Sequence, residues 1–320
     1  MKIKTLVRSA GFKEILDSRL AEHGFASEQV DPGLPLASQL ADAQVLICGL
    51  QKIDRQMIDM CPRLLLVHLA GMGYDNVDLD YCSARSISVA NVPLANAVSV
   101  AEHAMFLMLY LAKNRQGGAG GAMKKRVHGV LGSELYGKTL LVVGLGATGT
   151  EVAKRARGFG MRVIAITKDP VGQGREKSFS ADEIKGREAM LECVARADYV
   201  SLHVPLTEAT RGMIGSREFG AMKPSAFLVN MARAPVVDRD ALYGALTGGL
   251  IAGAAFDVFW EEPASPDDRL LKLGNFVLTP HVAGWTKESV DAVAGIISAN
   301  IRRVSEGSGP LTPVGLEQQQ

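Results

Sequence analysis

Three side chains in the second half of the chain are suited to acid–base chemistry and to anion binding. Arg233, Glu262 and His281 each follow a short apolar run that predicts a strand. An arginine binds a carboxylate in a fork, and an imidazole transfers protons near neutral pH. A carboxylate beside that imidazole fixes its tautomer and stabilises its charged form. Together these groups suit reduction of a small 2-oxo acid at C2. Taken singly, each residue has a structural alternative. Arg233 is then a surface charge, Glu262 an exposed loop acid, and His281 a residue that caps a strand end.

A glycine-rich turn precedes these segments. The residues at 144–149 read Gly-Leu-Gly-Ala-Thr-Gly and lie between a predicted strand at 139–143 and a helical pattern. Gly144 permits a tight turn, Gly146 lets a pyrophosphate approach the backbone, and Gly149 lets helix and strand pack closely. The N–H groups and dipole at the start of the helix favour phosphate. The turn therefore predicts dinucleotide binding, and the alternative is a structural turn.

The end of the next predicted strand bears on the choice of cofactor. A carboxylate there binds the ribose 2′-hydroxyl of NAD and repels a 2′-phosphate. The predicted strand at 162–167 ends in Thr167, followed by Lys168, with Asp169 two positions late. Since Lys168 can pair with a phosphate, the sequence favours NADP over NAD. One alternative is that Lys168 is a solvated loop charge. The other is that the Asp169 side chain turns toward the ribose and supplies the carboxylate.

Composition limits the other classes of function. The 320 residues are 47% hydrophobic and 22% charged, with a net charge of +1, which favours neither a nucleic-acid partner nor a membrane segment. The four cysteines are widely spaced and predicted to be reduced and buried. No apolar core of a signal peptide follows the first residue, so we expect a cytoplasmic protein. No histidine pair has metal-ligand spacing, so no metal is expected; His68 and His103 are interpreted as packing residues.

Strand-like and helix-like segments alternate along the chain, which is typical of parallel-sheet α/β domains. In the first third, strands are expected at 3–7, 45–47, 64–68 and 87–89, and helices at 13–23, 55–61, 77–84 and 98–113. A glycine-rich break is expected at 116–121. Six more strands are expected at 139–143, 162–167, 198–202, 226–230, 251–256 and 276–278, before a last helix at 287–305. The second series matches a doubly wound sheet.

The motifs resemble those of the D-isomer-specific 2-hydroxyacid dehydrogenase family along nearly the whole chain. The matching segments are 70–78, 91–103, 132–149, 202–210, 230–238, 257–263 and 279–286. One departure is Ala234, where the family usually has glycine; another is Thr167 with Lys168. The resemblance implies two doubly wound parallel-sheet domains, with a Rossmann cofactor domain at 100–286 inserted into a flavodoxin-like substrate domain at 1–99 plus 287–320. It also implies a homodimer.

The resemblance assigns roles to individual residues. Arg233 would clamp the substrate carboxylate, His281 would be the general acid of reduction and the base of oxidation, and Glu262 rather than Glu261 would be its partner. The loop Gly71, Met72 and Gly73 would offer backbone N–H groups to the substrate. The cofactor, NAD or NADP, would contact residues from six segments: Gly144, Gly146, Ala147, Thr148, Gly149, Thr167, Lys168, His203, Pro205, Thr210, Met231, Ala232, Asp257 and Gly284.

Two other functions stay open at this point. The same fold can serve as an NAD(P)-sensing binding protein or corepressor, although all three reacting positions are filled here. A formate- or phosphite-type dehydrogenase would use the same three residues on another hydride donor. We expect the dehydrogenase, with hydride moving between NAD(P)H and C2 of a small 2-oxo or 2-hydroxy acid. The side chain of that acid and the favoured direction are not fixed by the sequence.

Overall fold

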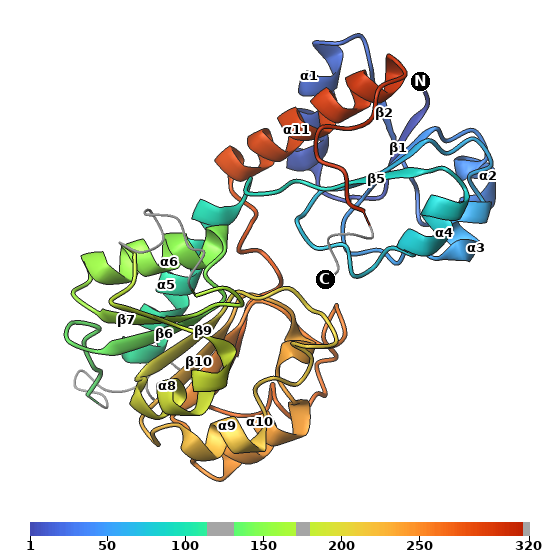
Figure 1. Ribbon diagram of the computed structural model, residues 1–320. Helices are drawn as coiled ribbons and strands as arrows, with labels where there is room; N and C mark the ends of the chain where they lie inside the picture. The colour runs from blue at the N-terminus through green and yellow to red at the C-terminus, as the bar shows by residue number, and fades with distance from the viewer. Residues whose placement is uncertain (114–130, 171–179, 316–320) are drawn as a thin grey trace. The chain divides into compact units, whose positions relative to one another are not determined.

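The computed structural model describes residues 1–113, 131–170 and 180–315 (Figure 1). It divides into two compact units: 1–96 with 285–320, and 97–284. We call them the first and the second unit. The expected break at 116–121 lies outside the described residues.

The first unit contains a parallel sheet of five strands in the order β2-β1-β3-β4-β5, the flavodoxin-like order. Four of the strands were expected from their apolar runs. The fifth, β2, is a three-residue edge strand that reads Ser-Glu-Gln and was missed. The strands are β1 (Ile3–Thr5), β2 (Ser27–Gln29), β3 (Val45–Cys48), β4 (Leu66–Leu69) and β5 (Ser88–Ala90).

Helices pack on both faces of this sheet. The short helices are α2 (Leu36–Leu40), α3 (Arg55–Asp59) and α4 (Leu79–Ala84). On the other face, α1 (Ala10–Ala21) lies beside α11 (Lys287–Ser305), as Figure 1 shows. The apolar side of α11, with Ile297 and Ile301, shares a core with Phe12 and Leu16 of α1. The last helix thus completes a core that begins at the start of the chain.

The second unit is built on a seven-stranded parallel sheet in the order β12-β11-β10-β9-β6-β7-β8. In sequence order, β6, β7 and β8 extend the sheet from its centre toward one edge, and the next four strands extend it toward the other edge. This is the arrangement of a Rossmann sheet. Six strands were expected; the seventh, β8, is an edge strand whose residues are all partly exposed. The strands are β6 (Thr139–Val143), β7 (Arg162–Ile166), β8 (Glu183–Lys185), β9 (Tyr199–Leu202), β10 (Phe227–Asn230), β11 (Gly253–Phe256) and β12 (Phe276–Leu278).

Both faces of the second sheet are buried, because successive side chains of a strand point to opposite sides. Leu141 and Val143 of β6 join one apolar core, and Leu140 and Val142 join the other. Two cores of this kind hold the strand ends at fixed positions. The helices are α5 (Ala97–Lys113), α6 (Ala147–Gly158), α8 (Met190–Arg196), α9 (Ser216–Ala221) and α10 (Arg239–Thr247), with 3-10 turns η1 (Arg187–Ala189) and η2 (Ala234–Val236).

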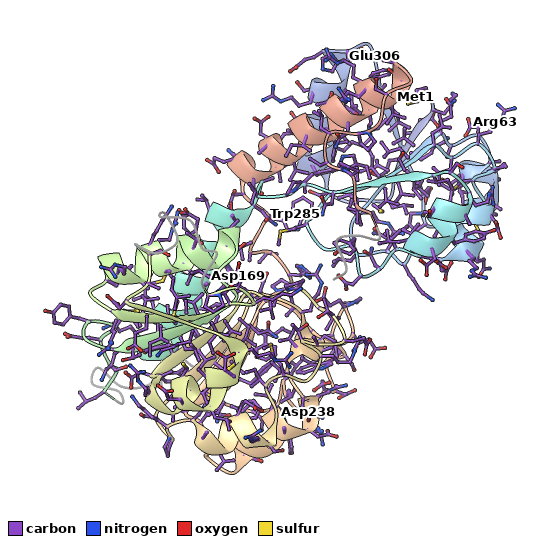
Figure 2. The ribbon with its side chains drawn as sticks, in the orientation of Figure 1. Met1, Arg63, Asp169, Asp238, Trp285 and Glu306 are labelled. Atoms are coloured by element: carbon purple, nitrogen blue, oxygen red, sulfur yellow. The ribbon has the colours of Figure 1, made fainter. Side chains whose placement is uncertain are left out.

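Helix starts follow their capping residues. The Asp238 side chain, labelled in Figure 2, accepts the N–H of Ala241 at the start of α10, and Thr286 does the same for Ser289 in α11. All four cysteines are buried and unpaired, as expected. Within the described ranges, no helix has the length and apolar character needed to cross a membrane.

Candidate active site

The candidate site residues of the second unit lie where parallel strands end. The glycine turn follows β6, Thr167 follows β7, His203 follows β9, Arg233 follows β10, and the remaining groups follow β11 and β12. These strands are neighbours in one sheet, so their carboxyl ends share one edge. In open α/β sheets that edge is where ligands bind.

His281 and Glu262 are in direct contact. The imidazole Nδ1 of His281 lies 2.7 Å from Oε2 of Glu262, and Oε1 of Glu262 accepts the N–H of Phe259 at 2.8 Å. The two side chains are 28% and 25% exposed, so the pair is partly open to solvent. Glu261 makes no such contact. With its Nδ1 proton directed to the carboxylate, the imidazole can move a proton through Nε2.

The environment keeps Glu262 ionised. Burial is the largest single effect and acts to raise the pKa of its carboxyl, but the hydrogen bonds and positive charges around it together outweigh burial, and the net pKa is lowered. His281 contributes both a hydrogen bond and a charge. The Phe259 N–H and the positive charge of Arg233 act in the same direction. Arg233 therefore lies close enough to Glu262 for their charges to interact, and the three predicted groups form one electrostatic cluster.

A buried asparagine shapes the turn that carries Arg233. Asn230, fully buried at the end of β10, accepts the N–H of Ala232 at 2.9 Å and donates to the carbonyl of Arg233 at 3.0 Å. Arg233 Nη1 also donates to the Ala232 carbonyl at 3.0 Å. Asn230 was not among the site residues expected from the sequence. Its only signal was a polar residue that ends an apolar strand.

Asp257 serves the turn that carries His281. Its two carboxylate oxygens accept the N–H groups of Val282 (3.0 Å) and Ala283 (2.9 Å) and the hydroxyl of Thr279. His281 has a φ of 54°, a left-handed backbone that non-glycine residues rarely adopt, so its turn needs such support. We expected Asp257 to contact the cofactor. In the structure it is 3% exposed and its oxygens are bound within the protein.

His103 of α5 adds to this group. Its Nε2 lies 3.0 Å from the Thr279 hydroxyl and 3.6 Å from an Asp257 oxygen. Burial lowers the pKa of His103, although the Asp257 charge acts against that change. The residue, interpreted from the sequence as packing, therefore contacts the support of the His281 turn.

The glycine turn has the geometry of a phosphate cradle. Gly144 has a φ of +97°, and a Cβ there would lie 2.7 Å from the carbonyl oxygen of His203. A Cβ at Gly149 would lie 1.9 Å from the carbonyl oxygen of Gly144, so neither position can hold another residue without movement. A Cβ at Gly146 would meet nothing within 4 Å. The backbone is thus open only where a pyrophosphate would approach.

Several polar groups on the residues around this turn are unpaired. Within the described residues, no acceptor is assigned to the backbone N–H groups of Ala147 and Thr148, which begin α6. The buried hydroxyl of Thr150 and Nδ1 of His203 also have no partner there. Burial lowers the pKa of His203 to about 3, so its ring is neutral. These groups fit a dinucleotide, whose phosphates and polar atoms would accept or donate the missing hydrogen bonds.

The remaining cofactor candidates lie on the same edge. Thr167 is half-buried and its N–H donates to Lys185 of β8 at 3.1 Å, whereas Lys168 is exposed. Thr210 folds back on its loop, its hydroxyl donating to the Pro205 carbonyl at 2.6 Å. Met231, Ala232 and Gly284 follow β10 and β12 directly or within a few residues. The predicted set thus comes from six strand ends.

The predicted substrate loop belongs to the first unit. Gly71, Met72 and Gly73 follow β4, and Met72 is 47% exposed. Trp285, labelled in Figure 2, belongs to the same unit. In the structure its ring packs edge-on against Phe12 at 5.8 Å and stays 45% exposed.

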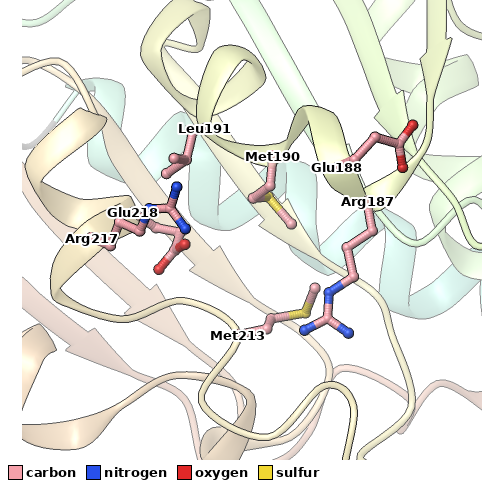
Figure 3. A pocket seen from close by; sticks show the side chains of 7 residues that line it. All are labelled: Arg187, Glu188, Met190, Leu191, Met213, Arg217 and Glu218. Carbon is pink, nitrogen blue, oxygen red and sulfur yellow. The ribbon is translucent and has the colours of Figure 1, made fainter.

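A separate hollow of about 430 Å³ lies between η1, α8 and α9 (Figure 3). None of the predicted site residues lines it, and it contains no imidazole. Its walls are methionine, leucine and two Arg–Glu neighbours in sequence: Arg187, Glu188, Met190, Leu191, Met213, Arg217 and Glu218. The groups that can transfer a proton lie outside this hollow, so we place the candidate reaction site at the strand edge.

Comparison with known proteins agrees with this fold. The family model described as "D-isomer specific 2-hydroxyacid dehydrogenase, NAD binding domain" matches residues 104–283. The chain therefore belongs to the D-isomer-specific 2-hydroxyacid dehydrogenase family, which confirms the resemblance seen in its motifs.

Individual relatives share most of this chain. It is 38% identical to a glyoxylate reductase of Korarchaeum cryptofilum, over 88% of this chain and 86% of that one. It is 39% identical to a D-3-phosphoglycerate dehydrogenase of Methanocaldococcus jannaschii, over 85% of this chain and 52% of that one. The chain spans about half the length of such phosphoglycerate dehydrogenases.

A solved structure extends the comparison to three dimensions. The NADPH-dependent glyoxylate/hydroxypyruvate reductase of Sinorhizobium meliloti superposes with a TM-score of 0.78 at 27% identity. The match covers 98% of this chain and 96% of the other. Two parallel α/β sheets, predicted from the sequence, are thus confirmed as the fold.

Proposed function

We propose that this protein is an NAD(P)-dependent enzyme that transfers a hydride to and from C2 of a small 2-oxo or 2-hydroxy acid, forming the D-isomer. The observation that carries the proposal is the 2.7 Å contact of His281 with an ionised Glu262, with Arg233 near enough to act on the same carboxylate. The cluster lies on the edge of a sheet whose glycine turn fits a dinucleotide.

Each group would have one task in the reduction. A bound nicotinamide dinucleotide supplies the hydride. Arg233 would bind the substrate carboxylate in a fork and orient the neighbouring carbonyl. His281 would donate a proton from Nε2 to the carbonyl oxygen as negative charge develops there. Glu262 would stabilise the imidazolium before transfer and hold its tautomer afterwards.

The unit at 97–284 would bind the cofactor, and the unit at 1–96 with 285–320 would bind the acid through Gly71, Met72 and Gly73. We also assign the cofactor contacts to the fourteen residues named above, with Asp257 acting through the His281 turn as well. Thr167 carries no charge against a 2′-phosphate, and exposed Lys168 can pair with it, which supports NADP over NAD. Relatives that reduce glyoxylate support a short substrate side chain.

A spectrophotometric panel tests this proposal. Glyoxylate, hydroxypyruvate and pyruvate are each offered with NADPH and with NADH, and the chirality of the product is determined. We expect oxidation of NADPH with at least one acid, and loss of most turnover in His281→Ala and in Arg233→Ala. Near-normal rates in both variants would reject the mechanism. Absence of turnover with every pair, despite cofactor binding, would favour a nucleotide-sensing protein.

We further propose a homodimer formed through α5. Val98 and Phe106 of this helix are 50% and 52% exposed, and a second copy of the chain would cover both side chains. Sedimentation should give twice the chain mass of 34.1 kDa. A monomer at micromolar concentration would contradict this assembly.

A further inference from the structure

The loop at 71–73 is tied to its own unit through two carbonyl groups. The carbonyl of Gly71 accepts the N–H of Val92 at 3.3 Å, and the carbonyl of Met72 accepts Nδ2 of Asn91 at 2.8 Å. No acceptor for the N–H groups of Gly71, Met72 and Gly73 is assigned within the described residues. The loop therefore has its acceptors bound to the scaffold and its donors open, the arrangement that binds an anion such as a carboxylate.

Asn91 is held in turn by a residue near the end of the chain. Thr312 donates its hydroxyl to the Asn91 carbonyl at 2.6 Å, and its own carbonyl accepts the Asn91 N–H at 3.3 Å. Asn91 is 8% exposed, so water competes little for these bonds. The position of the Asn91 side chain thus depends on a segment 221 residues away in sequence.

A buried pair fixes Thr312. The amide nitrogen of Asn300, on α11, donates to the Thr312 hydroxyl at 2.9 Å and to Nε2 of His68 at 2.8 Å. The amide oxygen of Asn300 accepts the N–H of Leu311 at 2.6 Å. His68 and Asn300 are fully buried. Because the Asn300 oxygen is occupied by a backbone donor, its nitrogen must donate to His68 and to Thr312.

These bonds run in one direction. His68 Nδ1 donates to the Leu69 carbonyl at 3.0 Å, so its Nε2 is the acceptor for Asn300. The Thr312 hydroxyl accepts from Asn300 and therefore donates to Asn91. Each donated hydrogen, including the two on the Asn300 amide nitrogen, has one acceptor, so the bonds have a single arrangement. It begins at His68 within β4 and ends on the Met72 carbonyl, just beyond the same strand.

We propose that Asn91, Thr312 and Asn300 are positioning residues for the substrate loop at 71–73, and that the segment after α11 sets the affinity for the 2-oxo acid. This inference rests on the proposed function. Holding the loop carbonyls against the scaffold keeps its N–H groups ready for the substrate carboxylate, without the cost of ordering the loop on binding. The contact is the same in the ground state and the transition state, so its loss acts on KM rather than kcat.

Substitution of Thr312 tests this proposal. Thr312→Val keeps the shape and removes the hydroxyl, whereas Thr312→Ser restores it. We expect the KM for the preferred oxo acid to rise about tenfold in Thr312→Val with kcat within about twofold. Thr312→Ser should return KM to the wild-type value. The dissociation constant of NADPH, measured by fluorescence titration, should be unchanged in both.

Ser298→Ala is the matched control. Ser298 also lies on α11, is 3% exposed, and donates its hydroxyl to a backbone carbonyl of the same unit, that of Arg19 at 2.8 Å. It has no bond to the network, so its loss should leave KM unchanged. A KM increase in Ser298→Ala equal to that of Thr312→Val would overturn the proposal, because general loosening of the unit would explain both.

The KM of a second variant and hydrogen exchange at one amide test the same proposal independently. If Thr312→Val does not fold, Asn91→Ala removes the donor to Met72 and should raise KM in the same way. Hydrogen exchange at the Val92 amide should be faster in Thr312→Val and at the wild-type rate in Thr312→Ser. A wild-type protein that reduces no oxo acid refutes the proposed function. An active wild type with unchanged KM in folded Thr312→Val and Asn91→Ala refutes only this inference.

Discussion

Glu262 joins the imidazole of His281 to the backbone of its own turn: one carboxylate oxygen lies 2.7 Å from His281 Nδ1, and the other accepts the Phe259 N–H at 2.8 Å. The Phe259 bond orients the carboxylate before any substrate arrives. The charge facing His281 is therefore preorganised, which is what general acid catalysis requires.

Replacing this charge should slow the reaction. In Glu262→Gln we expect kcat for oxo-acid reduction to fall about 10- to 100-fold, because a neutral amide no longer places a negative charge beside the imidazole. Pre-steady-state and steady-state rates measure this fall. Glu261→Gln is the control and should behave as wild type; equal effects in the two variants would contradict the assignment.

The residue at the end of β7 should decide the cofactor. In Thr167→Asp we expect the ratio of kcat/KM for NADPH to that for NADH to fall about 100-fold, because the carboxylate repels a 2′-phosphate and binds a 2′-hydroxyl. Thr167→Asn has nearly the shape of Asp without its charge and is the control. If Asn changes the ratio as much as Asp, charge is not the cause. If Asp changes nothing, the interpretation of this position is wrong.

Substitutions of two glycines in the turn should affect different properties, one the stability of the fold and the other the binding of the cofactor. Gly149→Ala places a methyl 1.9 Å from the Gly144 carbonyl oxygen, so we expect the free energy of unfolding to drop by about 3 kcal/mol. Gly146→Ala meets nothing within 4 Å and should change stability by less than about 1 kcal/mol. It should nevertheless weaken NADPH binding strongly, because the methyl occupies the approach of the pyrophosphate. Denaturant unfolding and fluorescence titration test the pair; tight binding by Gly146→Ala would contradict the cradle.

His68 should make the first unit sensitive to acid. Burial lowers the pKa of His68 to about 4, against the smaller effect of its bond to the Leu69 carbonyl. The folded pKa is below the unfolded value, so the stability is present above about pH 6.5 and is lost as the pH falls toward 4. Between pH 8 and pH 5 the loss is about 2 kcal/mol.

His68→Gln provides the comparison, because its amide oxygen can still accept from Asn300 and does not titrate. The variant should lose about 2 kcal/mol less than wild type over the same pH range, as followed by denaturant unfolding. His203 titrates alike in both proteins and cancels. Equal pH dependence in the two proteins would show that His68 is not the buried acid-sensitive group.

Much of this molecule could be predicted because the information is local. The strand at 139–143 and the last helix at 287–305 were expected with the bounds that the structure has. Apolar runs mark buried central strands, since both faces of the sheet are covered. The edge strands β2 and β8 were missed because exposed strands carry polar residues and lack that signal. Helix α1 begins three residues earlier than expected, where the Ser9 side chain caps the N–H of Phe12.

The residues of the candidate site also fall into those that local sequence predicts and those that it does not. Arg233, Glu262 and His281 were identifiable because each follows a strand in a recognisable motif. The supports of these residues were not, because they depend on pairs distant in sequence: Asp257 with Ala283, or His68 with Asn300, which are 232 positions apart. A buried polar residue is conspicuous in a structure, but in a sequence nothing tells which partner satisfies it.

The two units also differ in how they are assembled from the chain. The second is one uninterrupted stretch, whereas the first needs α11 to cover Phe12 and Leu16. During synthesis from the N-terminus, residues 97–284 are complete while the opening segment still exposes part of its apolar surface. The second unit can therefore fold on the ribosome before the first. The N-terminal residues, which emerge earliest, are among the last to reach their final packing.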